Sequence, residues 1–144
     1  IEFKTQAGPS FGNNFNNRVE EAIGNATDLW TAFREGAFKL SGKPWLGYFM
    51  MLEDAPGSTS TVRFSSPHFP AFNVFNGTSY AERYRIFCER MIRERLYDST
   101  CLILSPREGG RRGEYTEPVE ELSFPNFAAS LMGHAIAFAK KRGK

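Results

Sequence analysis

The chain has 144 residues, of which 41% are hydrophobic and 24% are charged, and its formal net charge is +2. This size and composition are ordinary for a globular protein and predict one compact domain over residues 1–144. So small a net charge points to no partner by itself. Its apolar runs are far shorter than the roughly twenty residues that cross a bilayer, so we expect no membrane-spanning segment.

Residues 1–6 alternate apolar and polar side chains, which is the pattern of a half-buried strand. Glu2, Lys4 and Gln6 then share one face, because successive side chains on a strand point to opposite sides. A carboxylate beside a lysine suits metal-assisted hydrolysis, since the carboxylate binds Mg²⁺ through oxygen and the lysine offsets charge on a phosphate oxygen. Taken alone, this pattern more often indicates an edge strand with a solvated charged face.

Apolar residues at three- and four-residue steps over residues 15–37 predict a helix of about twenty residues. Asn13 or Asn14 is expected to cap it, and Gly36 to help end it. Its polar face carries Arg18 and Glu21, which form either an ordinary surface pair or part of a site.

A second strand is predicted over residues 46–52, where an almost continuous apolar run suits a parallel strand covered on both faces. Residues 53–66 read as a loop, and residues 67–77 as a further loop rich in aromatic side chains. We expect that aromatic loop to pack on the sheet of its own domain; the alternatives are a dimer contact and a wall of a DNA groove.

The clearest helical stripe runs from residue 80 to residue 96, with Ser79 as its predicted cap. Its outer face mixes arginines and glutamates that form four-residue pairs such as Glu89–Arg93. Cys88 on this helix and Cys101 on the next strand, residues 100–105, lie in apolar settings, so we expect buried free thiols and a cytosolic protein.

Residues 106–118 combine glycines with three arginines, and a last helix is predicted over residues 124–141. In a DNA-binding protein this segment is the best candidate for base contacts, because arginine bonds guanine through two hydrogen bonds and a glutamate accepts from cytosine. On the residues alone, the preferred interpretation of this segment is a flexible charged hairpin. The candidate residues in it are Arg107, Arg111, Arg112, Glu114 and Tyr115, with Glu117 as a second possible acceptor. The alternation of strands and helices predicts an α/β fold with a mixed sheet.

One long string carries a resemblance to a known family. Glu2-x-Lys4, the run QAGPSFGNNFNNR from Gln6 to Arg18, and EEA-x-G at residues 20–24 resemble the XhoI-type restriction endonucleases of the PD-(D/E)XK nuclease superfamily. Further likeness lies at residues 99–105 and 113–118. The specificity of the resemblance lies in the long string and not in the Glu-x-Lys pair.

The resemblance implies a restriction-endonuclease-like α/β/α sandwich and a set of site residues. Glu2 would ligate Mg²⁺, Lys4 would position the attacking water, and Gln6 and Glu21 would be secondary metal or water contacts, Glu21 being favoured over Glu20. Asn17 and Arg18, together with the segment at residues 106–118, would contact DNA.

In this family a metal-binding Asp comes from a strand before the Glu-x-Lys strand. The sequence has no initiator methionine and opens within a strand that we expect to be central. We therefore expect the C-terminal portion of a longer protein, with N-terminal strands and that Asp missing, and no activity from this portion alone.

The function that the resemblance implies is that of a prokaryotic, cytoplasmic type II restriction enzyme. It would be a homodimer that uses Mg²⁺ to cut double-stranded DNA at a palindrome, CTCGAG in XhoI-type enzymes. Two alternatives remain: a structure-specific repair or recombination nuclease with the same chemistry, and a DNA-binding or assembly module that does not cut.

Overall fold

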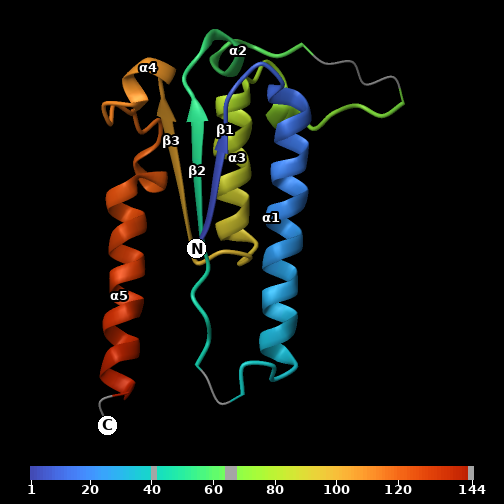
Figure 1. Ribbon diagram of the computed structural model, residues 1–144. Coiled ribbons are helices and arrows are strands. Elements are labelled where there is room, and N and C mark those ends of the chain that lie inside the picture. Colours follow the sequence, from blue (N-terminus) through green and yellow to red (C-terminus); the bar gives the residue numbers. More distant parts are fainter. Residues whose placement is uncertain (40–41, 64–67, 143–144) are drawn as a thin grey trace.

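The computed structural model describes residues 1–39, 42–63 and 68–142 of the chain (Figure 1). The strands are β1 (Glu2–Gln6), β2 (Gly47–Glu53) and β3 (Ser99–Ser105). The long helices are α1 (Phe11–Arg34), α3 (Tyr80–Arg93) and α5 (Phe124–Arg142). Short helical turns fill the connections: α2 (Pro56–Thr59), η1 (Asn73–Phe75), α4 (Arg107–Gly110) and η2 (Glu120–Leu122). The predicted α/β class and the order of strands and long helices are confirmed.

The strands form a parallel sheet in the order β1-β2-β3. β2 lies in the middle, and its side chains Tyr48, Met50 and Leu52 are fully buried, as its apolar run predicts. The sequence predicts a mixed sheet with β1 in its centre. Within the described residues the named strands pair only in parallel, and the antiparallel pairing seen there is an isolated bridge between Leu104 and Thr116. β1 has a neighbouring strand on one side, so it is an edge strand of the described sheet.

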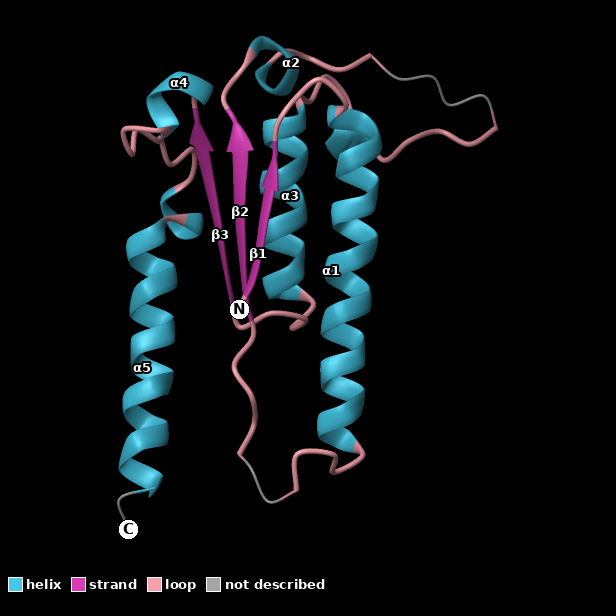
Figure 2. Cartoon of the chain, in the orientation of Figure 1, coloured by secondary structure: helices cyan, strands magenta, loops and turns pink. Residues whose placement is uncertain are grey.

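Helices lie against both faces of this sheet (Figure 2). One face packs on α1 and α3 in a large apolar core that includes Met50, Tyr84 and Leu102. The other face packs on α5 through a smaller cluster around Cys101 and Phe127. α1 and α5 both extend past the ends of the strands (Figure 1). None of the helices in the described part of the chain is long and apolar enough to cross a membrane.

α1 begins at Phe11, three or four residues before the start that its predicted cap implies. Ser10 precedes its first turn, so the prediction that Asn13 or Asn14 caps the helix is wrong. The reason is tertiary packing: Phe11 is buried and stacks on Tyr80 of α3, which fixes the first turn of α1 against the core. The end was predicted well, since Gly36 follows the helix with a φ of 73°.

α3 matches its prediction closely. The Ser79 hydroxyl accepts from the backbone N–H of Glu82, whose carboxylate accepts from the Ser79 N–H in return. Glu89 pairs with Arg93 as predicted, and also with Arg85. The predicted free thiols are confirmed as well, since Cys88 and Cys101 are both buried and unpaired.

The aromatic loop does not pack on the sheet, so that prediction is wrong. Phe69 and Phe72 are 84% and 76% exposed. The physical reason is that α1, α3 and α5 already occupy the sheet's apolar faces, which leaves this loop outside them. Phe75 alone of its described phenylalanines turns inward, where its ring lies 5.4 Å from the guanidinium of Arg90. The part of the predicted loops at residues 64–67 lies outside the described residues.

Candidate active site

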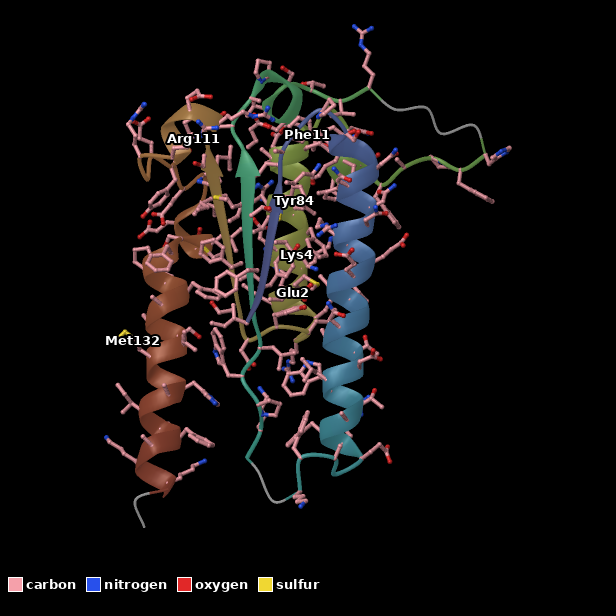
Figure 3. All side chains as sticks on the ribbon, in the orientation of Figure 1. Glu2, Lys4, Phe11, Tyr84, Arg111 and Met132 are labelled. Atoms are coloured by element: carbon pink, nitrogen blue, oxygen red, sulfur yellow. The ribbon has the colours of Figure 1, made fainter. Side chains whose placement is uncertain are left out.

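The strand β1 presents Glu2 and Lys4 to helix α1, as the alternation of its side chains predicts (Figure 3). The Lys4 ammonium nitrogen lies 3.2 Å from Oε1 of Glu2 and 2.9 Å from Oε2 of Glu21 on α1. Arg18 approaches the same Glu21 oxygen at 3.2 Å. One lysine therefore bridges a carboxylate of the strand and a carboxylate of the helix, in a half-buried position.

These contacts shift the pKa values of Lys4 and Glu21. The hydrogen bond to Glu21 raises the pKa of Lys4, with smaller contributions from Glu2 and against the opposing effect of burial. The same hydrogen bond lowers the pKa of Glu21, helped by the charge of Arg18. Lys4 is therefore a stable cation at neutral pH, which suits a role in offsetting negative charge rather than in accepting a proton.

The carboxylate of Glu2 has two further partners that bring in distant parts of the chain. Nδ2 of Asn25 donates to Oε1 at 3.0 Å, and the Tyr97 hydroxyl donates to Oε2 at 2.5 Å. Tyr97 follows α3 and is 95 residues from Glu2 in sequence. The pKa of Tyr97 is raised, first by burial and then by its hydrogen bond to Glu2. Sequence analysis missed Tyr97, because nothing in its local pattern distinguishes it from a core tyrosine.

Gln6, the third polar residue of β1, is buried, and both ends of its amide are bonded within the protein. Nε2 donates to the backbone oxygen of Phe11 at 2.7 Å, and Oε1 accepts from the hydroxyl of Tyr84. The side chain thus ties β1 to the start of α1 and to α3. Its predicted contact with a metal or a water stays a prediction.

A second polar cluster lies at the carboxyl ends of the strands, where Arg111 is seen in Figure 3. Arg107 forms two hydrogen bonds to Glu53, at 2.9 and 3.0 Å, and Glu53 also accepts from the backbone N–H of Gly8 at 2.7 Å. A pocket of about 340 Å³ is lined by the ends of the strands and by Arg107 and Arg111. Open pockets at this edge of a parallel sheet are common ligand sites.

The other candidates for DNA contact divide into exposed and engaged side chains. Asn17 is exposed on α1, and Tyr115 is half-exposed. Arg112 pairs with Glu114 at 2.8 Å. Glu117 is engaged elsewhere, since its carboxylate accepts from the backbone N–H of Phe124 at the start of α5. The bridge between Leu104 and Thr116 anchors the segment to β3, so it is an anchored loop with one helical turn rather than a free hairpin.

The donor chemistry around Glu2 fits a hard divalent cation in part. Mg²⁺ is usually held by one or two carboxylates, with waters and substrate phosphate completing its shell, and Glu2 supplies one such oxygen ligand. A hollow of about 420 Å³, lined in part by Glu2, Asn25, Asp28 and Tyr97, opens beside that carboxylate. In residues 1–39, 42–63 and 68–142, no group of three or more His, Cys, Asp or Glu side chains is arranged to hold a metal ion.

Comparison with known proteins gives a consistent set of relatives. The family model described as restriction endonuclease XhoI matches residues 1–117. The type II restriction enzyme BstVI of Geobacillus stearothermophilus is 53% identical over 139 residues, which are 96% of this chain and 62% of BstVI. XhoI of Xanthomonas vasicola is 52% identical over 92 residues, which are 64% of this chain and 37% of that enzyme.

A third relative, the type II restriction enzyme AbrI of Azospirillum brasilense, is 64% identical over 69 residues, covering 48% of this chain and 31% of AbrI. The chain thus spans less than two thirds of the length of these curated relatives. No solved structure matches it.

Proposed function

Because this chain belongs to the XhoI restriction endonuclease family, we propose that it forms part of a type II endonuclease that hydrolyses phosphodiester bonds in double-stranded DNA with Mg²⁺. The observation that carries the proposal is the position of Lys4 between Glu2 and Glu21, on the strand that faces α1. A lysine held beside a carboxylate in this way offers a fixed positive charge next to an oxygen ligand for a cation.

Each residue of the cluster has a role in this proposal. Glu2 would bind the Mg²⁺ ion, which when bound would supply Lewis-acid polarisation of a phosphoryl oxygen and activation of a water. Lys4 orients the attacking water and stabilises the charge that builds on the phosphate oxygens. Glu21 holds Lys4 through Oε2; no hydrogen bond within the described residues reaches its Oε1, which leaves that oxygen for the predicted secondary contact with the ion.

For Gln6 we propose a role that differs from the predicted one. Since both ends of its amide are bonded to Phe11 and Tyr84, we propose that it positions β1 against α1 and α3 and does not touch the metal. A direct contact would require the loss of one of these buried hydrogen bonds, which costs about 1–3 kcal/mol.

The fold proposal follows from the sheet and the helices that cover it. The parallel sheet with helices on both faces fits a portion of a restriction-endonuclease-like α/β/α sandwich, whose sheet would become mixed through strands paired to the free edge of β1. A further carboxylate, an Asp from such a strand, would complete the metal site. We therefore propose that this chain alone is a partial nuclease domain that does not cut DNA.

The remaining parts of the proposal concern the target and the assembly. Arg18 and Asn17 on α1 and the segment at residues 106–118 would contact DNA, with arginines on phosphate and base edges. The full-length protein would be a homodimer that acts in the prokaryotic cytoplasm on a palindrome, with CTCGAG as the first site to test. A symmetric dimer suits a symmetric DNA target.

The test uses the full-length protein, a long defined DNA duplex and Mg²⁺. Glu2→Ala and Lys4→Ala are compared with the control variants Glu35→Ala and Lys39→Ala, whose side chains are exposed just beyond the end of α1. We expect the wild type and the controls to give discrete fragments that share one palindromic end sequence. Each site variant should cut at least about 10³-fold more slowly, because it loses charge stabilisation made in the transition state.

Cutting that survives both site substitutions would remove Glu2 and Lys4 from the chemistry. A binding module would be favoured instead if the protein binds DNA equally tightly with Ca²⁺ and with chelator and never cuts it. Cleavage at junctions or ends rather than at one sequence would favour a structure-specific nuclease.

A further inference from the structure

Three parts of the chain converge on the carboxylate of Glu2. Lys4 and Asn25 both donate to Oε1, at 3.2 and 3.0 Å, and Tyr97 donates to Oε2 at 2.5 Å. These donors come from β1, from α1 and from the residue that leads from α3 toward β3. The carboxylate is thus oriented by donors from three separate parts of the fold.

Tyr97 is the most firmly held of the three donors. It is 4% exposed, and its ring packs at 64° against Tyr48, with 5.5 Å between the ring centroids. Its hydroxyl also lies 3.0 Å from the backbone oxygen of Ala22 on α1. A glutamate side chain has several rotatable bonds, so a rigid partner helps it to keep one orientation.

The donors also determine which oxygen remains for a cation. An ionised carboxylate offers about four acceptor positions, two on each oxygen. Oε1 already receives two donors, whereas Oε2 receives only the Tyr97 hydroxyl among the described residues. The open position on Oε2 is therefore the one for an ion that enters from the hollow beside Glu2, whose lining includes Tyr97.

We propose that Tyr97 is a positioning residue that fixes Glu2 so that Oε2 binds the divalent cation. This inference rests on the proposed function, in which Glu2 is a metal ligand. Mg²⁺ demands near-ideal octahedral geometry, so an oxygen ligand that is free to rotate holds it less well. Partners of this kind typically change metal affinity or activity by 10- to 100-fold when they are removed.

The experiment measures Mn²⁺ binding to the full-length protein by electron paramagnetic resonance, independently of cleavage. Tyr97→Phe removes the hydroxyl and keeps the ring, and we expect it to weaken Mn²⁺ binding about tenfold. Tyr48→Phe is the matched control, because Tyr48 is buried in the same core and its hydroxyl contacts the sulfur of Met50. That control should bind Mn²⁺ as the wild type does, whatever its unfolding temperature.

Asn25→Ala provides a second variant, since Asn25 is exposed on α1 and its loss should leave the fold intact. We expect it to weaken Mn²⁺ binding about threefold, less than the lower end of the range for such partners, because Lys4 still donates to Oε1. Should Tyr97→Phe fail to fold, this variant decides: wild-type Mn²⁺ binding by Asn25→Ala would overturn the idea that the donors orient Glu2.

Glu2→Ala separates this inference from the proposed function. If Glu2→Ala loses Mn²⁺ binding while Tyr97→Phe binds as tightly as the wild type, the positioning role fails and the function stands. Equal losses in Tyr97→Phe and Tyr48→Phe would also overturn it, because they would report core packing only. If Glu2→Ala binds Mn²⁺ and cuts DNA normally, both proposals fall.

Discussion

Two polar clusters in this molecule each centre on a glutamate, and they are built in opposite ways. In the strand cluster, which comprises Glu2, Lys4, Glu21, Asn25 and Tyr97, the side chains of Glu2 and Lys4 are only 14% and 20% exposed. In the arginine segment, residues 106–118, the side chains of Arg107 and Arg112 are 61% and 68% exposed. The carboxylate of Glu53, which holds Arg107, is by contrast 13% exposed.

This difference in exposure indicates which step, DNA binding or DNA cleavage, each cluster serves. Donors from several elements, among them the buried Tyr97, hold a group in one place, which matters for the geometry of a reaction. Exposed arginines are weakly constrained by surface ion pairs and remain able to exchange a glutamate for a phosphate. We expect changes in the strand cluster to alter the rate of cleavage, and changes in the arginine segment to alter the affinity for DNA.

The sharpest test of this division is Lys4→Arg, which keeps the charge and changes its shape. A guanidinium cannot take the place of an ammonium held at 3.2 and 2.9 Å between two carboxylates without displacing one of them. We expect single-turnover cleavage by the full-length protein to slow about 100-fold. DNA affinity measured with Ca²⁺ should stay within about threefold, and a normal rate would show that charge alone is enough.

The converse test removes the positive charge of the arginine segment by changing Arg107, Arg111 and Arg112 together to Ala. DNA affinity should fall about 10- to 100-fold, and its dependence on salt should weaken by about 0.9 in slope for each phosphate that the protein no longer neutralises. Cleavage at saturating DNA should change little. A control that removes Arg90, Arg93 and Arg95 of the α3 region changes net charge equally, and the division fails if it has the same effect.

A third test concerns the buried hydrogen bond between Tyr84 and Gln6 behind the strand cluster. Tyr84→Phe leaves the Gln6 carbonyl buried without this donor, so we expect the free energy of unfolding to fall by about 1–3 kcal/mol. Denaturant titration measures this loss. The rate of cleavage per folded molecule should be unchanged. A change in the Mg²⁺ concentration that half-maximal cleavage requires would instead return Gln6 to the metal site.

The same contrast explains what could be predicted from the sequence. The shared face of Glu2 and Lys4, the buried strand β2 and the stripe of α3 all follow from local periodicity, and each was predicted from it. The Tyr97–Glu2 and Tyr84–Gln6 contacts join residues 95 and 78 positions apart, so no local pattern signals them. The start of α1 and the exposure of Phe69 depend on which surfaces other elements have already covered.

The smallest expected effect is a change in the acid stability of the arginine segment. Two hydrogen bonds from Arg107, and then the backbone N–H of Gly8, hold the pKa of Glu53 below its ordinary value of 4.5. A carboxyl group whose pKa is lower in the folded than in the unfolded state stabilises the fold above the unfolded pKa, and this contribution is lost as pH falls through the folded pKa.

Glu53→Gln should therefore flatten the loss of thermal stability on acidification, measured as the unfolding temperature from about pH 6 to about pH 3. Some slope will remain, because the pKa values of Glu21 and Glu82 are lowered as well. Glu108→Gln is the matched control, since Glu108 is exposed on α4 beside Arg107. If Glu53→Gln and Glu108→Gln keep the same acid slope, then Glu53 does not hold the arginine segment to the sheet in solution, and Arg107 is free without DNA.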